Sequence, residues 1–211
     1  MDGLTPRDAE IAMSILTWAR SVLAVENEEV NRPHGSQVVC PFVAGSIDSN
    51  AFRMFFHNEV NGQSEEQIEG ILLPYIQRFK TLPPFDDAHK FNKALLVVFP
   101  NIDDGQLAVL DVSHGRLKSQ FVNAGLMIGQ FHAKCKEQGI WNSRFRPSVS
   151  PWPLVAIRHM ALHDIIFLRG SSEWFAGYNI RFGDRFKPNQ IDDDARPFAE
   201  LYYKALAEYR L

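Results

Sequence analysis

The chain has 211 residues, of which 45% are hydrophobic, and this is enough apolar surface for one sizeable core. Its formal net charge is −3, and it has no dense run of Lys or Arg of the kind that follows a phosphate backbone. Nucleic acid is therefore not an expected partner. Because Pro and Gly are scattered and no repeat is visible, we expect a single domain over residues 1–211.

The first twenty residues differ from a secretory signal, because they carry acidic residues where such a signal is positively charged. No stretch reaches the roughly 18 uninterrupted apolar residues that a membrane-spanning helix needs. We therefore expect a cytoplasmic protein without a membrane partner. The two cysteines, Cys40 and Cys135, lie far apart in sequence, and a reducing compartment disfavours a disulfide between them.

The first half of the chain predicts two helices and a strand. Thr5 and Pro6 are typical of a helix start, and apolar residues recur at helical spacing through residues 5–25. Residues 38–43 contain Pro41 and fit an edge strand or a turn. A strand is expected over residues 51–56, and a capped helix from Ser64 to about residue 80, which Pro74 should kink or split.

The second half predicts a sheet core and more helices. Residues 95–99 form a wholly apolar run stopped by Pro100, which is typical of a buried central strand. Helices are expected from about 103 to 112, from 117 to 138 and from 195 to 209, and residues 155–160 fit a strand. The fold class is then α+β, with a central mixed or antiparallel sheet flanked by helices.

The helix expected at 117–138 would place Gly125, Gly129 and His132 on one face. Glycine inside a helix costs roughly 1 kcal/mol relative to alanine, so a bare stripe beside an imidazole suggests a flat, bulky ligand such as a porphyrin. The alternative is close packing of the helix against another element, with His132 as a hydrogen-bonded core histidine.

Two other groups of residues offer metal ligands. His159, His163 and Asp164 would begin a two-histidine, one-carboxylate iron site if they lay on a helix, but a strand at 155–160 would separate them. Cys40, followed by Pro41, could give a thiolate to haem iron, although a lone cysteine beside a strand is more often buried packing.

Three blocks resemble a family of small proteins of unassigned function from bacteria and some fungi: VVCPFV at 38–43, LKSQFVNAGLMIGQFH at 117–132 and SPWPLVAIRHMALHDIIFL at 150–168. The order of these features is also distantly similar to the YqcI/YcgG family. Some members of that family are haem-dependent oxygenases that act on guanidine or amino-acid nitrogen in natural-product pathways.

The resemblance implies that haem b is bound with His132 as its axial metal ligand and with Cys40 and Phe42 in the pocket wall. We further expect Gly125, Gly129 and Trp152 to line the cofactor site, and His132, Arg158 and His159 to act in catalysis or in substrate and propionate contacts. The expected function is oxidation of a small amino-acid-like or guanidine-like substrate, with an electron donor or peroxide as co-reactant. A non-catalytic module for a small ligand or haem, a mononuclear non-haem iron enzyme and a homodimer are open alternatives.

Overall fold

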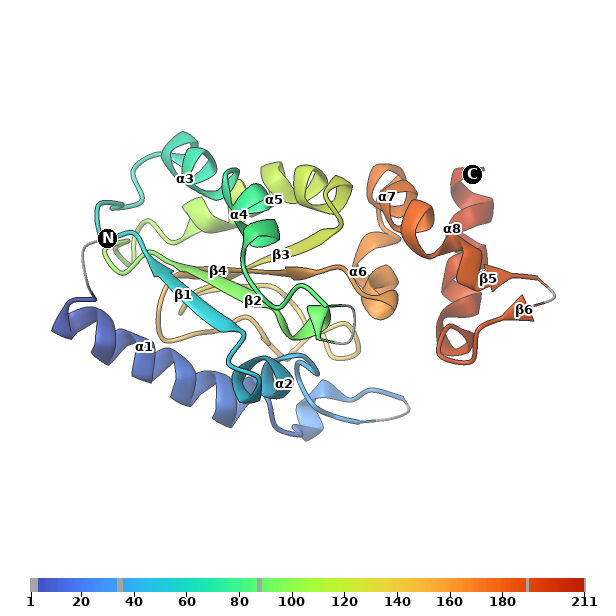
Figure 1. Ribbon diagram of the computed structural model, residues 1–211, viewed down its shortest axis with the longest axis horizontal. Helices are drawn as coiled ribbons and strands as arrows, with labels where there is room; N and C mark the ends of the chain where they lie inside the picture. Colours follow the sequence, from blue (N-terminus) through green and yellow to red (C-terminus); the bar gives the residue numbers. More distant parts are fainter. Residues whose placement is uncertain (1–3, 34–35, 87–88, 189, 211) are drawn as a thin grey trace. The chain divides into compact units, whose positions relative to one another are not determined.

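The computed structural model describes residues 4–33, 36–86, 89–188 and 190–210. Its elements confirm an α+β fold with a mixed four-stranded sheet flanked by helices (Figure 1). The contacts divide the chain into two units, the first formed by residues 1–117 and 128–158, the second by residues 118–127 and 159–211. Among the described residues, none of the helices combines the length and the apolar character needed to cross a lipid bilayer.

The sheet contains four strands in the order β1, β2, β4, β3. Strands β1 and β2 are parallel, with Phe52 opposite Ala94, and β4 is antiparallel to β2, with Ala94 opposite Arg158. As expected, the apolar run near residue 95 occupies an interior position, and the side chains from Leu95 to Val98 are buried. The strand bounds are β1 Phe52–Phe56, β2 Ala94–Val98, β3 Leu126–Phe131 and β4 Leu154–His159.

Helices cover both faces of this sheet in the first unit (Figure 1). Helix α1 (Pro6–Trp18) packs Ile11 and Ile15 against Leu96 on one face. Helix α1 begins with the predicted cap, because Thr5 Oγ1 accepts a hydrogen bond from the Asp8 amide and the Asp8 carboxylate accepts one from the Thr5 amide. A π-helical turn, Ala19–Leu23, continues α1, which confirms the helix expected over residues 5–25.

The remaining helices of the first unit agree only in part with those expected from the sequence. Pro74 splits the expected helix into two, as predicted. Of the edge strand or turn expected at residues 38–43, the turn is found: Val38 makes only an isolated bridge with Glu26, and the chain turns after Cys40 into a short helix. The bounds are α2 Val43–Asp48, α3 Glu65–Leu72, α4 Tyr75–Thr81 and α5 Ala108–Asn123, with short 3-10 turns at Glu28–Val30 and Lys90–Asn92.

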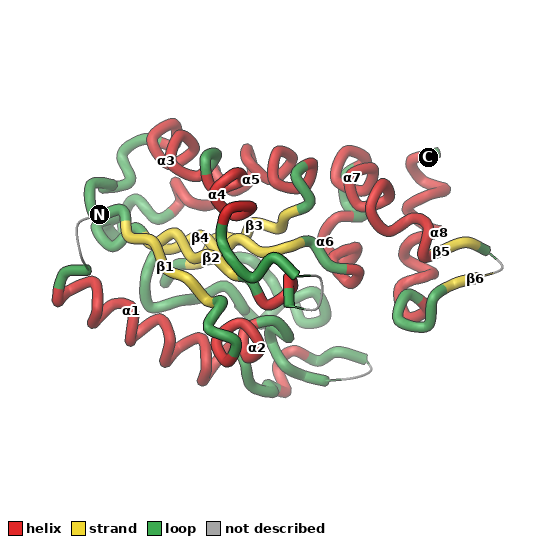
Figure 2. Tube along the Cα trace, in the orientation of Figure 1, coloured by secondary structure: helices red, strands yellow, loops and turns green. Residues whose placement is uncertain are grey.

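The second unit is mostly helical after residue 159 (Figure 2). It is built on an aromatic core. The Phe186 and Tyr202 rings stack with their centroids 4.1 Å apart, and Phe175 and Tyr178 are wholly buried beside them. Its elements are a 3-10 turn at Leu162–Asp164, α6 Ile165–Leu168, α7 Ser172–Phe182, a 3-10 turn at Gly183–Arg185, β5 Phe186–Lys187, β6 Gln190–Ile191, a 3-10 turn at Arg196–Phe198 and α8 Ala199–Tyr209.

The helix expected over residues 117–138 is the main error of the sequence analysis. A single helix, α5, runs through Gly115 to Asn123, and strand β3 follows after Gly125. Gly125 has a φ of +79°, a left-handed conformation that ends the helix and that residues with a Cβ rarely adopt. Residues 126–131 then continue as a strand, so Gly125, Gly129 and His132 do not share a helical face.

Two glycines of the α5 region should respond to alanine in opposite directions. Gly125→Ala should lower the free energy of unfolding by about 1 to 2 kcal/mol, because its left-handed backbone disfavours a Cβ. The added atom would also lie 2.6 Å from Nε of Arg181. Gly115→Ala should raise stability by up to about 1 kcal/mol, because nothing lies within 4 Å of the added atom inside the helix. Urea denaturation of both variants measures this, and equal effects would contradict the assigned turn.

Candidate metal centre

His132 lies directly after strand β3 and still pairs with the chain beside it. Its amide donates to the Ser148 carbonyl at 3.3 Å, and its own carbonyl accepts from the Ser150 amide at 3.4 Å. The residue is 1% exposed. Because two backbone hydrogen bonds join His132 to residues 148–150, this pairing fixes the direction of the imidazole.

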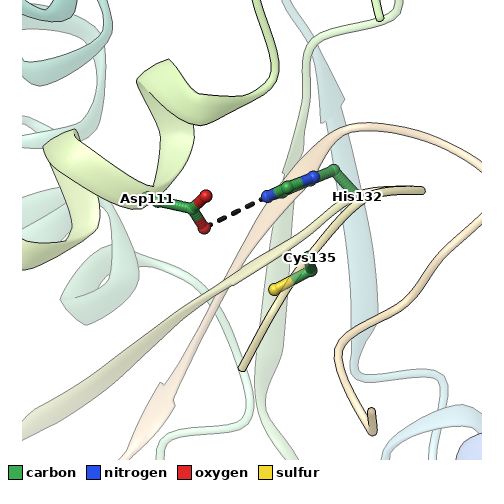
Figure 3. Close-up of side chains that lie close together, drawn as sticks. All are labelled: Asp111, His132 and Cys135. Atoms are coloured by element: carbon green, nitrogen blue, oxygen red, sulfur yellow. Dashed lines mark hydrogen bonds and ion pairs between the residues drawn. The ribbon is translucent and has the colours of Figure 1, made fainter. Parts of the chain in front are cut away.

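The imidazole of His132 meets a carboxylate from helix α5. Its Nε2 lies 3.1 Å from Oδ1 of Asp111 (Figure 3). The Gln130 side-chain amide donates to the same oxygen at 3.1 Å. Side chains alternate along a strand, so Gln130 and His132 point to the helix α5 face while Phe131 points to the opposite one. Phe131 accordingly packs edge-on against Trp18 of α1.

Cys135 approaches the same point from a tight turn. Its amide donates to the His132 carbonyl at 3.1 Å, which folds the chain back beneath the imidazole (Figure 3). One ligand atom each from Asp111, His132 and Cys135 all lie within 4.8 Å of one another. Among the residues that the structure describes, this is the group of His, Cys, Asp and Glu side chains that converges closely enough to hold a metal ion.

The environment of the Cys135 sulfur combines burial with hydrogen-bond donors. The residue is 3% exposed, and burial raises the pKa of its thiol above the ordinary value, with the negative charges of Asp111 and Glu137 adding to the rise. The backbone of Glu137 and the side chain of Ser148 oppose part of that rise in pKa. These groups would stabilise a thiolate once a cation neutralised it.

Two further properties distinguish the site from an ordinary buried pair. Nδ1 of His132 is buried and has no hydrogen-bond partner among the described residues. The Asp111 side chain is 41% exposed, whereas that of His132 is 2% exposed, so solvent reaches the group from the carboxylate side. An incoming ligand would therefore approach past Asp111.

The structure does not assemble the pocket that the sequence analysis expected around His132. Gly125 lies in a turn, and a Cβ on Gly129, within β3, would have only the Phe131 ring in ordinary contact. The bare helical surface proposed for a macrocycle is therefore absent. Since His132 is 1% exposed and its Nε2 faces Asp111, its role as an axial haem ligand loses the geometry that suggested it.

The other residues expected in this pocket lie on the α1 face of the sheet. Cys40 packs in the cluster that contains Leu23 and Phe131, and Trp152 packs with Ile11 and Ile15, all on the opposite face from His132. The Arg158 guanidinium lies 4.3 Å from the centroid of the Phe42 ring. Placing Cys40, Phe42, Trp152 and Arg158 around the His132 imidazole was wrong, because the sheet separates them from it.

The alternative iron site is also not formed. His159 is the last residue of strand β4, whereas His163 and Asp164 follow in a 3-10 turn. Asp164 is wholly buried, and its carboxylate accepts a hydrogen bond from the Ala161 amide at 2.7 Å. The described side chains of these three residues do not converge in the way that Asp111, His132 and Cys135 do.

Sequence reasoning found His132 but missed its partners. The spacing His132-x-x-Cys135 was the available signal, since it brings an imidazole and a thiol to one turn. Asp111 carried no such signal, because it lies 21 residues earlier and meets His132 only through the packing of α5 on the sheet. Gln130 was not identified, because it lies in an apolar stretch for which the sequence predicts a helix.

Residues 12–193 match the family described as Domain of unknown function (DUF6875). The chain belongs to this family. No curated protein and no solved structure matches it. These comparisons do not connect this member of the family to YqcI/YcgG proteins, so that resemblance, and the haem b that it implies, stay predictions.

The two cysteines should differ strongly in reactivity. At neutral pH, iodoacetamide should modify Cys40 at least tenfold faster than Cys135, because Cys40 is partly exposed and Cys135 is buried with a raised pKa. Since alkylation needs the thiolate, the rate at Cys135 should still be rising at a pH where an ordinary thiol has reached its plateau. Peptide mass spectrometry measures both rates, and equal rates in the folded protein would contradict the described burial.

Proposed function

We propose that the protein binds one zinc ion through Asp111, His132 and Cys135, and that it uses the ion for Lewis-acid chemistry on a small substrate. The observation that carries this proposal is the convergence of a carboxylate, an imidazole and a thiol from a helix, a strand end and a turn. Three protein ligands leave one position of a tetrahedral zinc site for water or substrate, as in catalytic zinc sites.

The donor set favours zinc over other common ions. A thiolate disfavours magnesium and calcium, which prefer oxygen ligands, and a carboxylate disfavours copper(I), which prefers soft ligands. Zinc accepts sulfur, nitrogen and oxygen in the same site, and it undergoes no redox chemistry. The mixed set of Asp111, His132 and Cys135 is therefore best matched by zinc.

The distances are compatible with a shared ion after a small movement. Two ligands bonded at about 2.0 to 2.1 Å in a tetrahedral site lie about 3.3 Å apart. Nε2 of His132 and Oδ1 of Asp111 are 3.1 Å apart. A nitrogen and a sulfur ligand would be about 3.6 Å apart in such a site. Because the sulfur of Cys135 lies within 4.8 Å of the other two ligand atoms, it would have to move inward by at most about 1.2 Å.

The surrounding residues support the chemistry of such an ion. Gln130 donates to Asp111 and orients its carboxylate, while the backbone of Glu137 and the side chain of Ser148 favour the thiolate form of Cys135. A zinc ion held there would supply Lewis-acid chemistry, and it would lower the pKa of a bound water to about 7. The exposed side of Asp111 gives a substrate access to that position.

Zinc binding tests the proposal directly. Chelator-treated protein should bind one zinc per chain in a calorimetric titration, and Asp111→Ala, His132→Ala and Cys135→Ser should each weaken binding at least 100-fold. Gln130→Ala should weaken it about 10- to 100-fold, because it removes a group that only orients a ligand. Cobalt substitution should give a sulfur-to-metal charge-transfer band that Cys135→Ser abolishes.

Matched variants separate this outcome from general destabilisation. Cys40→Ser and His89→Ala remove the same types of side chain elsewhere in the chain and should leave zinc affinity and the cobalt spectrum unchanged. Circular dichroism establishes that each variant is folded. A folded wild-type protein that binds no zinc, or binds it equally well as Cys135→Ser, would refute the proposed site.

A further inference from the structure

Two basic side chains lie together on the face of the sheet that helix α4 covers. Arg53 is the second residue of β1, and Lys93 directly precedes β2. The parallel register places Arg53 opposite Leu95, so Lys93 lies diagonally across from Arg53 on the same face of the pleat. Burial lowers the pKa of Lys93, and the positive charge of the nearby Arg53 guanidinium lowers it further.

Lys93 is buried in an apolar setting. It is 3% exposed, and its Nζ donates to the carbonyl of Phe79 at 3.2 Å. The centroids of the Phe79 and Phe85 rings lie 4.9 Å and 5.2 Å from the same nitrogen. Ring faces and one carbonyl stabilise the ammonium in part, but none of them carries the negative charge that usually accompanies a buried cation.

Arg53 is half-buried and also lacks an acidic partner. Its Nε is buried and has no hydrogen-bond partner, and no carboxylate among the described residues forms an ion pair with Arg53 or Lys93. Other arginines of the chain are paired: Arg185 binds Asp192 and Asp194 at 2.7 Å and 2.6 Å. Two adjacent cations without a counter-charge repel each other in a medium of low dielectric constant.

We infer that Arg53 and Lys93 form a binding site for the carboxylate or phosphate group of a small molecule. A guanidinium offers paired donors that match two oxygens of an oxyanion, and the neighbouring ammonium adds a second positive charge. The Phe85 side chain, which is 68% exposed, supplies an apolar surface beside the ammonium for the organic part of such a ligand. This site is independent of Asp111, His132 and Cys135.

Calorimetric titration of the full chain with inorganic phosphate and with acetate, against sodium chloride at equal ionic strength, tests this inference. Saturable binding of phosphate, of acetate or of both is expected, and the preferred anion tells whether the site takes phosphate or carboxylate groups. Arg53→Met and Lys93→Met should each weaken binding at least tenfold. Lys80→Met, which removes an exposed cation from the end of α4, should leave it unchanged.

A third variant distinguishes this site from a metal-bound anion. Asp111→Ala should retain anion binding, because it disturbs only the proposed zinc ligands. Arg53→Met is the decisive substitution, since Arg53 is less buried than Lys93 and its loss leaves the apolar packing around the ammonium in place. Absence of saturable binding to the wild-type protein, or undiminished binding to folded Arg53→Met, would overturn the inference.

Discussion

The contact between Asp111 and His132 is the interaction on which the account of this protein depends. It joins the first half of helix α5 to the residue that directly follows strand β3, across 21 residues of sequence. His114, one helical turn after Asp111, reinforces the same connection, because its Nε2 lies 3.1 Å from the Ile128 carbonyl. Two polar contacts, one helical turn apart on α5, therefore join the helix to strand β3 and the residue after it.

This constraint decides which side chains can act together. Alternation along β3 sends Gln130 and His132 toward α5, and the turn to Cys135 returns the chain to the same place. Nδ1 of His132 is buried and has no hydrogen-bond partner among the described residues, so Nε2, which faces Asp111, is the ring nitrogen placed to bind an ion. In the proposed zinc site, the carboxylate, the ring and the thiol would all bind the ion in place of the hydrogen bond between Asp111 and His132.

Sequence reasoning succeeded where local physics determines the element. The apolar run ending at Pro100 is typical of a buried strand, and the cap at Thr5 fixed a helix start through hydrogen bonds within four residues. Pro74 split its helix for an equally local reason, the loss of a backbone donor. Such features need no knowledge of the rest of the fold.

Sequence reasoning failed at residues 117–138 because the local signals there are ambiguous. Apolar residues flanking Gly125 continue a helical spacing, but they also fit a buried strand, and only the left-handed backbone at Gly125 separates the two. The error placed His132 on a helix instead of directly after a strand. It also led to a predicted haem-binding surface that the fold does not contain. Asp111 could not be predicted for a different reason, because its contact with His132 arises from the packing of α5 on the sheet.

X-ray absorption at the zinc edge tests the central claim most directly, because it reports the atoms bound to the ion. Zinc bound by Asp111, His132 and Cys135 should have one sulfur at about 2.3 Å and nitrogen or oxygen ligands at about 2.0 to 2.2 Å. The sulfur should disappear in Cys135→Ser. A shell without sulfur in the wild-type protein would contradict the assignment of Asp111, His132 and Cys135 as a metal centre.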